Sequence, residues 1–121
     1  KVDIVDDYTL LLKREDIDIV SICLPPSLHQ QVTCDFLKEN KHVLCEKPMA
    51  SSLNEAKIMI DQMEKSTALL SIISQNRFKK SIMKVKKMLD LNYFGKIVYT
   101  RVNSMWYRGD NYYDLWWALP K

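Results

Sequence analysis

Short apolar runs recur along the chain about every 25 residues, and amphipathic stretches separate them. The runs lie at residues 17–24, 41–45 and 68–73. The first, IDIVSICL, is nearly continuous and rich in β-branched side chains, as in a strand covered on both faces of a parallel sheet. Between the runs, residues 28–37 and 56–63 carry apolar side chains at helical spacing. Strands and helices that alternate in this way predict an α/β fold with βαβ units and a parallel sheet.

Local signals mark where these elements begin and end. The two prolines at 25–26 cannot donate to a strand ladder, so the first strand is expected to stop there. Ser27 is the expected cap of the following helix, and Asn40 its expected stop. The S-x-x-E pattern at 52–55 is a capping box, which predicts that the next helix begins there.

The two ends of the chain differ from this repeating part. Residues 2–5 alternate apolar and polar, which predicts a further short strand or the tail of one, and about four strands in all. Residues 79–91 predict an amphipathic helix with Ile82, Val85 and Leu89 turned inward, and residues 97–106 predict a half-exposed, antiparallel-type strand. We therefore expect two domains, at residues 1–78 and 79–121.

Composition excludes several classes of function. A net charge of +3 is too small to indicate a nucleic-acid partner. No apolar run approaches the roughly 18 to 20 residues that span a bilayer, so no membrane partner is expected. The three cysteines are not spaced as a metal or redox pair, which favours the cytoplasm, and Cys23 and Cys45 are expected to be buried. Only two glycines are present, so a G-x-G-x-x-G dinucleotide turn cannot form within this chain.

Glu46 and Lys47 are the strongest candidates for chemistry, because they directly follow the run at 41–45. Ligands of open α/β sheets bind at the carboxyl ends of the strands. A carboxylate there can accept hydrogen bonds from ribose hydroxyls, and an ammonium can polarise a carbonyl or move a proton. The alternative is an ordinary surface ion pair, worth less than about 1 kcal/mol.

Three further groups occupy similar positions. Leu24 and Pro25, with His29, follow the first long strand, and Asn76 with Arg77 follows the last. Either of these two groups could equally form an ordinary loop. Aromatic side chains beside an arginine suit a sugar or a phosphate, although they could instead pack against a neighbouring segment. The candidate substrate residues of this kind are Trp106, Arg108, Tyr112 and Tyr113.

Three blocks, in this order and spacing, carry a family resemblance. They are DIDIVSICLP at 16–25 with His29, KHVLCEKP at 41–48, and NRF at 76–78. Together they resemble the Gfo/Idh/MocA oxidoreductases, relatives of glucose–fructose oxidoreductase and inositol dehydrogenase. The resemblance implies a partial Rossmann-type sheet, followed by the start of an α/β domain that serves substrate binding and oligomerisation. It also implies NAD or NADP as cofactor and a homo-oligomer when full length.

The resemblance also implies roles for individual residues. Lys47 takes the place of the catalytic lysine, in hydride transfer between NAD(P) and a hydroxyl carbon of a sugar, cyclitol or related polyol. The residues expected to contact the cofactor are Leu24, Pro25, His29, Glu46, Lys47, Asn76 and Arg77.

The chain also departs from the family pattern. It lacks the family's glycine-rich turn, so we expect an internal fragment that is inactive by itself. A non-catalytic α/β module that binds a sugar or a partner protein is the alternative.

Overall fold

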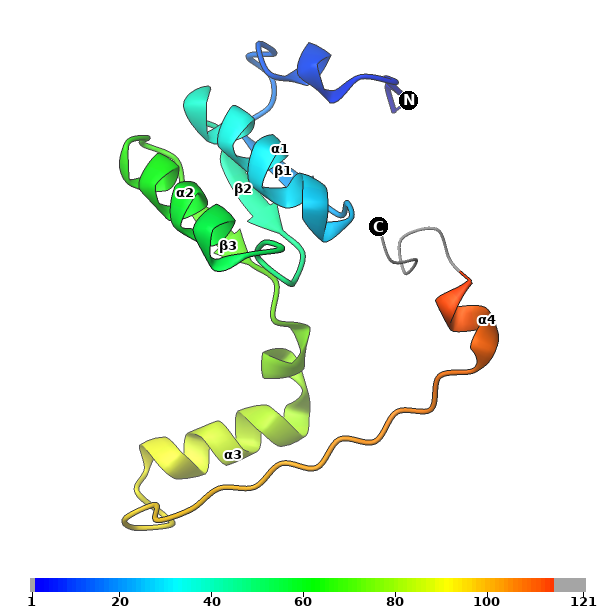
Figure 1. The fold of residues 1–121 in the computed structure, drawn as a ribbon. Helices are drawn as coiled ribbons and strands as arrows, with labels where there is room; N and C mark the ends of the chain where they lie inside the picture. Colours follow the sequence, from blue (N-terminus) through cyan, green and yellow to red (C-terminus); the bar gives the residue numbers. More distant parts are fainter. Residues whose placement is uncertain (1, 115–121) are drawn as a thin grey trace. The chain divides into compact units, whose positions relative to one another are not determined.

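The computed structural model describes residues 2–114 of the chain. The chain divides into two compact units, Lys1–Gln75 and Asn76–Lys121. The first unit holds the alternating strands and helices, and the second holds the tail (Figure 1). Each unit is described by itself below.

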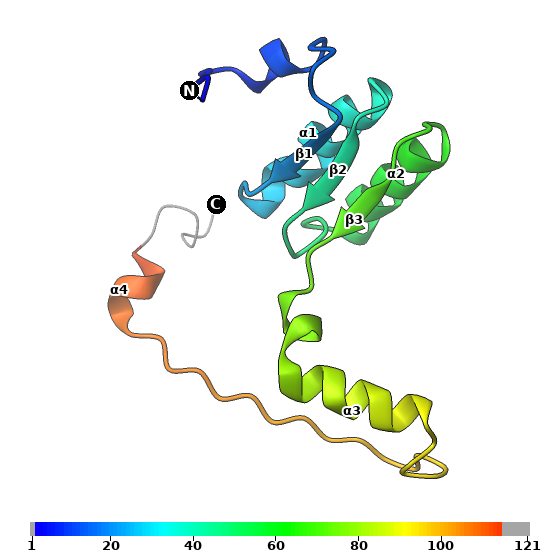
Figure 2. The same cartoon turned by 180° about the vertical axis from the view of Figure 1, so that it is seen from behind.

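The first unit is built on a three-stranded parallel sheet in the order β1-β2-β3. The strands are β1 (Ile19–Ile22), β2 (His42–Cys45) and β3 (Leu70–Ile72). Helices α1 (Pro26–Lys38) and α2 (Leu53–Glu64) connect them and lie on the same face of the sheet, as the two opposite views in Figures 1 and 2 show. The predicted α/β fold with a parallel sheet is therefore confirmed.

The two connecting helices begin in different ways. Helix α1 starts directly after Pro25 with Pro26 as its first residue, so the prediction that Ser27 caps it was wrong. Proline suits the first helical position, because it has no N–H to satisfy and its φ is preset. Helix α2 begins as predicted, with the Ser52 side chain accepting a hydrogen bond from the Glu55 amide at 3.2 Å.

The end of α1 also follows its sequence signal. The helix stops at Lys38, and Asn40 then adopts a φ of 55°, in the left-handed region. Asparagine tolerates this region better than most residues, which explains its use as a stop signal. The turn brings the chain directly into β2.

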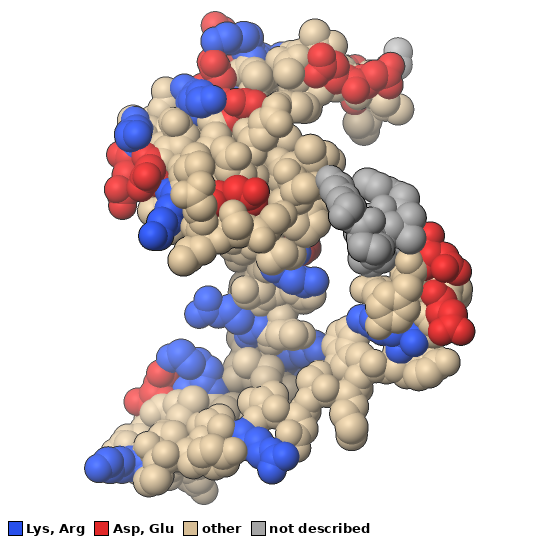
Figure 3. All heavy atoms as spheres, in the orientation of Figure 1, with Lys and Arg blue, Asp and Glu red and all other residues tan. Residues whose placement is uncertain are grey.

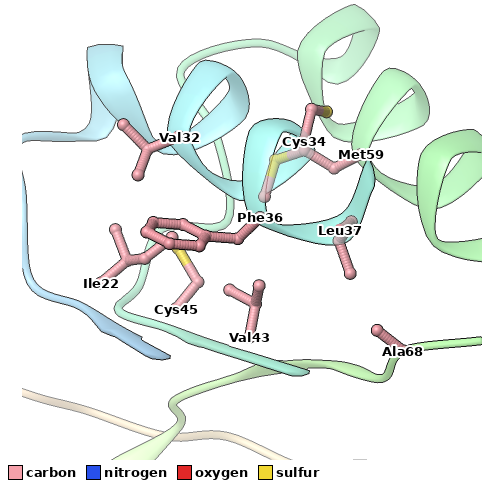
Figure 4. Close-up of a cluster of buried hydrophobic side chains, with 9 residues drawn as sticks. All are labelled: Ile22, Val32, Cys34, Phe36, Leu37, Val43, Cys45, Met59 and Ala68. Carbon is pink, nitrogen blue, oxygen red and sulfur yellow. The ribbon is translucent and has the colours of Figure 1, made fainter. Parts of the chain in front are cut away.

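The core lies between the two helices and the sheet (Figure 4). Leu37 from α1 and Met59 from α2 are fully buried there, and Val43 meets them from the central strand. Cys45 is buried as predicted, whereas Cys23 is exposed, because it follows the last residue of β1. The complete cluster consists of Ile22, Val32, Cys34, Phe36, Leu37, Val43, Cys45, Met59 and Ala68.

Two predictions for the first unit were wrong. Residues 2–5 form no strand, so the sheet has three strands among the described residues rather than about four. A strand needs a neighbour for its backbone hydrogen bonds, and residues 2–5 pair with none. Strand β1 is not covered on both faces, since Ile19 is 63% exposed and both helices lie on one side of the sheet.

The second unit contains a short 3-10 helix, η2 (Gln75–Phe78), which begins at the last residue of the first unit, and then α3 (Lys80–Asp90) and α4 (Asp110–Tyr113). Its lysine-rich helix α3 is present as predicted, and its basic side chains lie at the surface (Figure 3). Residues 97–106 are exposed and form no strand, because no described segment pairs with them. The side chains predicted to point inward from α3 are 43–47% exposed: Ile82, Val85 and Leu89.

No helix within residues 2–114 combines the length and the apolar character needed to cross a bilayer.

Candidate functional site

The candidate site lies where β1 and β2 end side by side. The last residues of the two strands, Ile22 and Cys45, are register partners. The Glu46 amide donates to the Ile22 carbonyl at 3.0 Å, and the Ile73 amide donates to the Cys45 carbonyl at 2.8 Å. The end of the central strand is therefore held from both sides. We name the segments that follow the β1 loop (residues 23–25) and the β2 loop (residues 46–52).

The Glu46 carboxylate turns back onto its own loop. Its Oε2 accepts a hydrogen bond from the Lys47 backbone amide at 3.0 Å. Its side chain is half-buried and forms no ion pair with the Lys47 ammonium. The surface ion pair considered as the alternative is therefore absent between these two residues.

Lys47 is exposed at the same edge, and its peptide bond to Pro48 is cis. Within residues 2–114, its ammonium makes no hydrogen bond and no ion pair. By contrast, Lys13 forms an ion pair with Glu39, and Lys38 forms one with Asp35. Lys47 thus presents an available cation at the carboxyl edge of the central strand.

His29 lies behind the two loops rather than at their surface. Its side chain is fully buried, with Nε2 2.7 Å from the Leu24 carbonyl oxygen and Nδ1 2.8 Å from that of Pro48. Both ring nitrogens are thus engaged inside the protein. The structure therefore places the His29 side chain inside the protein, whereas contact with a cofactor was expected from the sequence. The sequence did contain a signal for burial, because His29 shares the helix face of Val32 and Phe36, three and seven residues further on.

In the β1 loop the carbonyls of Leu24 and Pro25 both have partners inside the protein, so side chains are the main groups available to a ligand. The Leu24 carbonyl faces His29, and the Pro25 carbonyl accepts from the Leu28 amide at 2.9 Å. The Leu24 side chain is 40% exposed and Pro25 is half-buried. This loop therefore offers an apolar contact surface beside the charged residues of the β2 loop.

Cys45, the last residue of β2, takes no part in the exposed site. Burial raises the pKa of the Cys45 thiol, and its Sγ lies 3.5 Å from the Glu46 carbonyl oxygen. A buried, protonated thiol is a poor nucleophile. Cys45 is therefore a packing residue beneath the site.

A hollow of about 560 Å³ runs along the free edge of β1, outside the candidate site. Its lining is almost entirely apolar and meets the β1 loop only at Cys23 and Leu24. The charged groups of the β2 loop do not line it. Among the described residues, no three histidine, cysteine or acidic side chains gather as metal ligands.

The remaining predicted site residues belong to the second unit. Asn76 and Arg77 are exposed on η2. The Arg108 guanidinium lies over two rings, 5.1 Å from the centroid of Trp106 and 4.5 Å from that of Tyr112. Tyr113 packs edge-on against Tyr112, with ring centroids 5.3 Å apart. The four candidate substrate residues therefore form one aromatic–guanidinium cluster.

Comparison with known proteins identifies the first unit. Residues 1–74 match the model of an oxidoreductase family with an NAD-binding Rossmann fold. Over 88 residues the chain is 33% identical to an uncharacterized oxidoreductase of Schizosaccharomyces pombe, covering 73% of this chain and 24% of that protein. Over 94 residues it is 28% identical to the myo-inositol 2-dehydrogenase of Thermotoga maritima, covering 78% of this chain and 28% of that protein.

The fold agrees with these matches. The crystal structure of the WlbA dehydrogenase from Bordetella pertussis, in complex with NADH and UDP-GlcNAcA, superposes with a TM-score of 0.85 at 28% identity. The match covers 92% of this chain and 34% of that one. The chain thus spans about a quarter of the length of the curated relatives it matches. The resemblance carried by the three sequence blocks is confirmed, and the chain belongs to the Gfo/Idh/MocA oxidoreductase family, which has an NAD-binding Rossmann fold.

Proposed function

We propose that the whole protein is an NAD(P)-dependent dehydrogenase. It transfers a hydride between NAD(P) and a hydroxyl carbon of a sugar, cyclitol or related polyol. The observation that carries the proposal is the exposed Lys47 ammonium, unpaired within the described residues, at the carboxyl edge of the central strand. In open α/β sheets this edge is where dinucleotides bind. The names of the matched proteins support the substrate class, since one is a myo-inositol dehydrogenase and another was crystallised with NADH and a nucleotide sugar.

The residues of the edge fit such a cofactor. The half-buried Glu46 carboxylate has lone pairs beyond the one that accepts from the Lys47 amide, and these can accept from ribose hydroxyls. The apolar Leu24 side chain provides a surface for a planar ring. NAD(P), when bound, supplies the site that accepts or donates the hydride.

Lys47 supplies the acid–base part of the reaction. In oxidation of a hydroxyl carbon the neutral amine of Lys47 takes the hydroxyl proton as the hydride leaves that carbon for NAD(P)⁺, and in the reverse direction its ammonium returns the proton to the carbonyl oxygen. The main chain on both sides of Lys47 is anchored, by the Glu46 carboxylate before it and by the His29 contact to Pro48 after it. The Lys47 side chain therefore extends from a main chain that is anchored on both sides.

The second unit contributes to substrate binding in this proposal. Residues 79–121 begin the domain that binds the substrate and mediates oligomerisation, and Asn76 with Arg77 approaches the nicotinamide. Arg108, whose guanidinium lies over the rings of Trp106 and Tyr112, suits a sugar that carries an acidic group, because a guanidinium binds carboxylate or phosphate bidentately. We place the protein in the cytoplasm, as three free thiols favour.

The test is a turnover assay on the full-length protein. The purified protein is given NAD⁺ or NADP⁺ with a panel of cyclitols, sugars and nucleotide sugars, and the formation of reduced nicotinamide is followed by its absorbance. We expect turnover with at least one polyol class. Calorimetric binding of a sugar from the panel without any reduced nicotinamide would contradict the proposal and would favour the non-catalytic module.

A further inference from the structure

His29 joins the two loops of the candidate site from inside the protein. It lies in the first turns of α1, and its side chain is completely buried. One ring nitrogen contacts the Leu24 carbonyl of the β1 loop at 2.7 Å, and the other contacts the Pro48 carbonyl of the β2 loop at 2.8 Å. The two loops are separated in sequence by helix α1 and strand β2, yet a single imidazole ring spans the space between them.

The geometry of the ring makes this contact specific. The two nitrogens of an imidazole point in different directions from a rigid plane, so two simultaneous contacts define the spacing of the groups they meet. A carbonyl oxygen only accepts, and a neutral imidazole carries one N–H, so the ring donates to one of the two carbonyls in each tautomer and to both only when both nitrogens carry a proton. Carbonyls that are shielded from water are costly to leave without a donor, and His29 is the side chain that meets both of these part-buried groups.

The contact acts next to the candidate catalytic group. Pro48 directly follows Lys47, so His29 holds the main chain one residue after the lysine. On the other side, the Glu46 amide is bonded to Ile22 of β1, and the Glu46 carboxylate accepts from the Lys47 amide. Lys47 is thus the exposed residue between two anchored points. Removal of the His29 contact releases one of them.

We propose that His29 is a positioning residue, which locks the β1 loop to the β2 loop and so fixes the main chain from which Lys47 reaches the substrate. This inference rests on the proposed dehydrogenase function and deepens it. His29 itself does not touch substrate or cofactor, because it is fully buried. A displacement of about 1 Å in a catalytic group can cost as much as ~10²-fold in rate. The loss of His29 is therefore expected to reduce kcat more than it changes the KM of the polyol.

The experiment compares three variants of the full-length protein. His29→Gln keeps an amide group that can still donate to the carbonyls, and His29→Leu keeps bulk without any donor. The matched control is His42→Gln, which removes the other histidine, at the start of β2, whose Nδ1 accepts only from the Leu69 amide at 3.0 Å. Each variant is measured for kcat, KM and melting temperature, and for amide hydrogen exchange at residues 23–25 and 46–49.

We expect kcat to fall by about tenfold in His29→Gln and by about 10²-fold in His29→Leu, as misplacement of the lysine implies. Exchange should quicken at both loops in these variants and stay at the wild-type rate in His42→Gln. If His29→Leu does not fold, His29→Gln carries the comparison. Wild-type kcat in His29→Gln, with unchanged exchange at the loops, overturns the inference.

The outcome separates this inference from the proposed function. A wild-type protein that binds NAD(P) but turns over no substrate refutes the dehydrogenase by itself. In that case, faster exchange at both loops in His29→Gln still supports the tie between the loops, and unchanged exchange overturns it.

Discussion

Replacement of Lys47 by methionine separates catalysis from stability at the candidate site. Lys47 is exposed, and its ammonium has no partner within residues 2–114. Surface substitutions away from specific interactions usually change the free energy of unfolding by less than about 0.5 kcal/mol. Methionine keeps most of the length of the side chain and removes only the charge and the donors. The free energy of unfolding should therefore hardly change.

The expected catalytic effect is much larger. A positioned general acid–base group contributes about 10²–10⁴-fold to the rate. At about 1.36 kcal/mol per factor of ten, this corresponds to roughly 2.7–5.4 kcal/mol of transition-state stabilisation. The loss in kcat should thus exceed any loss in stability by about 2 kcal/mol or more.

The assay is steady-state kinetics of the full-length Lys47→Met variant, with thermal unfolding measured in parallel. Lys57→Met is the matched control, because Lys57 is exposed on α2 and makes no ion pair within the described part of the chain. Lys47→Arg tests the role of the proton, since a guanidinium keeps the charge but does not give up a proton near neutral pH. If Lys47→Met keeps kcat within about threefold of the wild type, well short of the contribution expected of an acid–base group, Lys47 is not that group.

Three further predictions concern the first unit. Ser52→Ala should lower the free energy of unfolding by about 1 kcal/mol, because the Ser52 side chain caps α2. Ser51→Ala should not, since Ser51 takes part through its backbone amide. Chemical denaturation of both variants measures the difference. Native alkylation followed by peptide mass spectrometry should modify the exposed Cys23 and spare Cys45, whose pKa is raised by burial, and equal labelling would contradict the core described here. The Arg14 guanidinium donates hydrogen bonds to the Asp16 carboxylate and lowers its pKa to about 2 from an ordinary value of 3.8. The stabilising contribution of this pair is therefore complete above about pH 4 and is lost as the pH falls through about 2. A carboxyl NMR titration with a midpoint near the ordinary value would disprove that pairing.

The sequence by itself determined the class of fold and the edge at which the candidate site lies. Periodic apolar residues record which face of an element is buried, so the alternation of strands and helices was visible without coordinates. Parallel connections then place the ends of consecutive strands at one edge, which brings the segment after β1 close to Glu46 and Lys47. The cap at Ser52 was also predictable, because it depends only on local sequence: Ser52 and the Glu55 amide that donates to it lie within one helical turn.

Only the tertiary structure decided the surroundings that depend on distant neighbours. His29 was predicted as a cofactor contact, but it meets a carbonyl 19 residues away and is fully buried. The apolar, β-branched pattern of residues 17–24 suggested a strand covered on both faces, although both helices pack on one side and leave Ile19 exposed. Residues 97–106 have the composition of a strand but no partner among the described residues. A side chain's burial and a strand's hydrogen bonds are properties of pairs of segments, so they become definite only when the chain has folded.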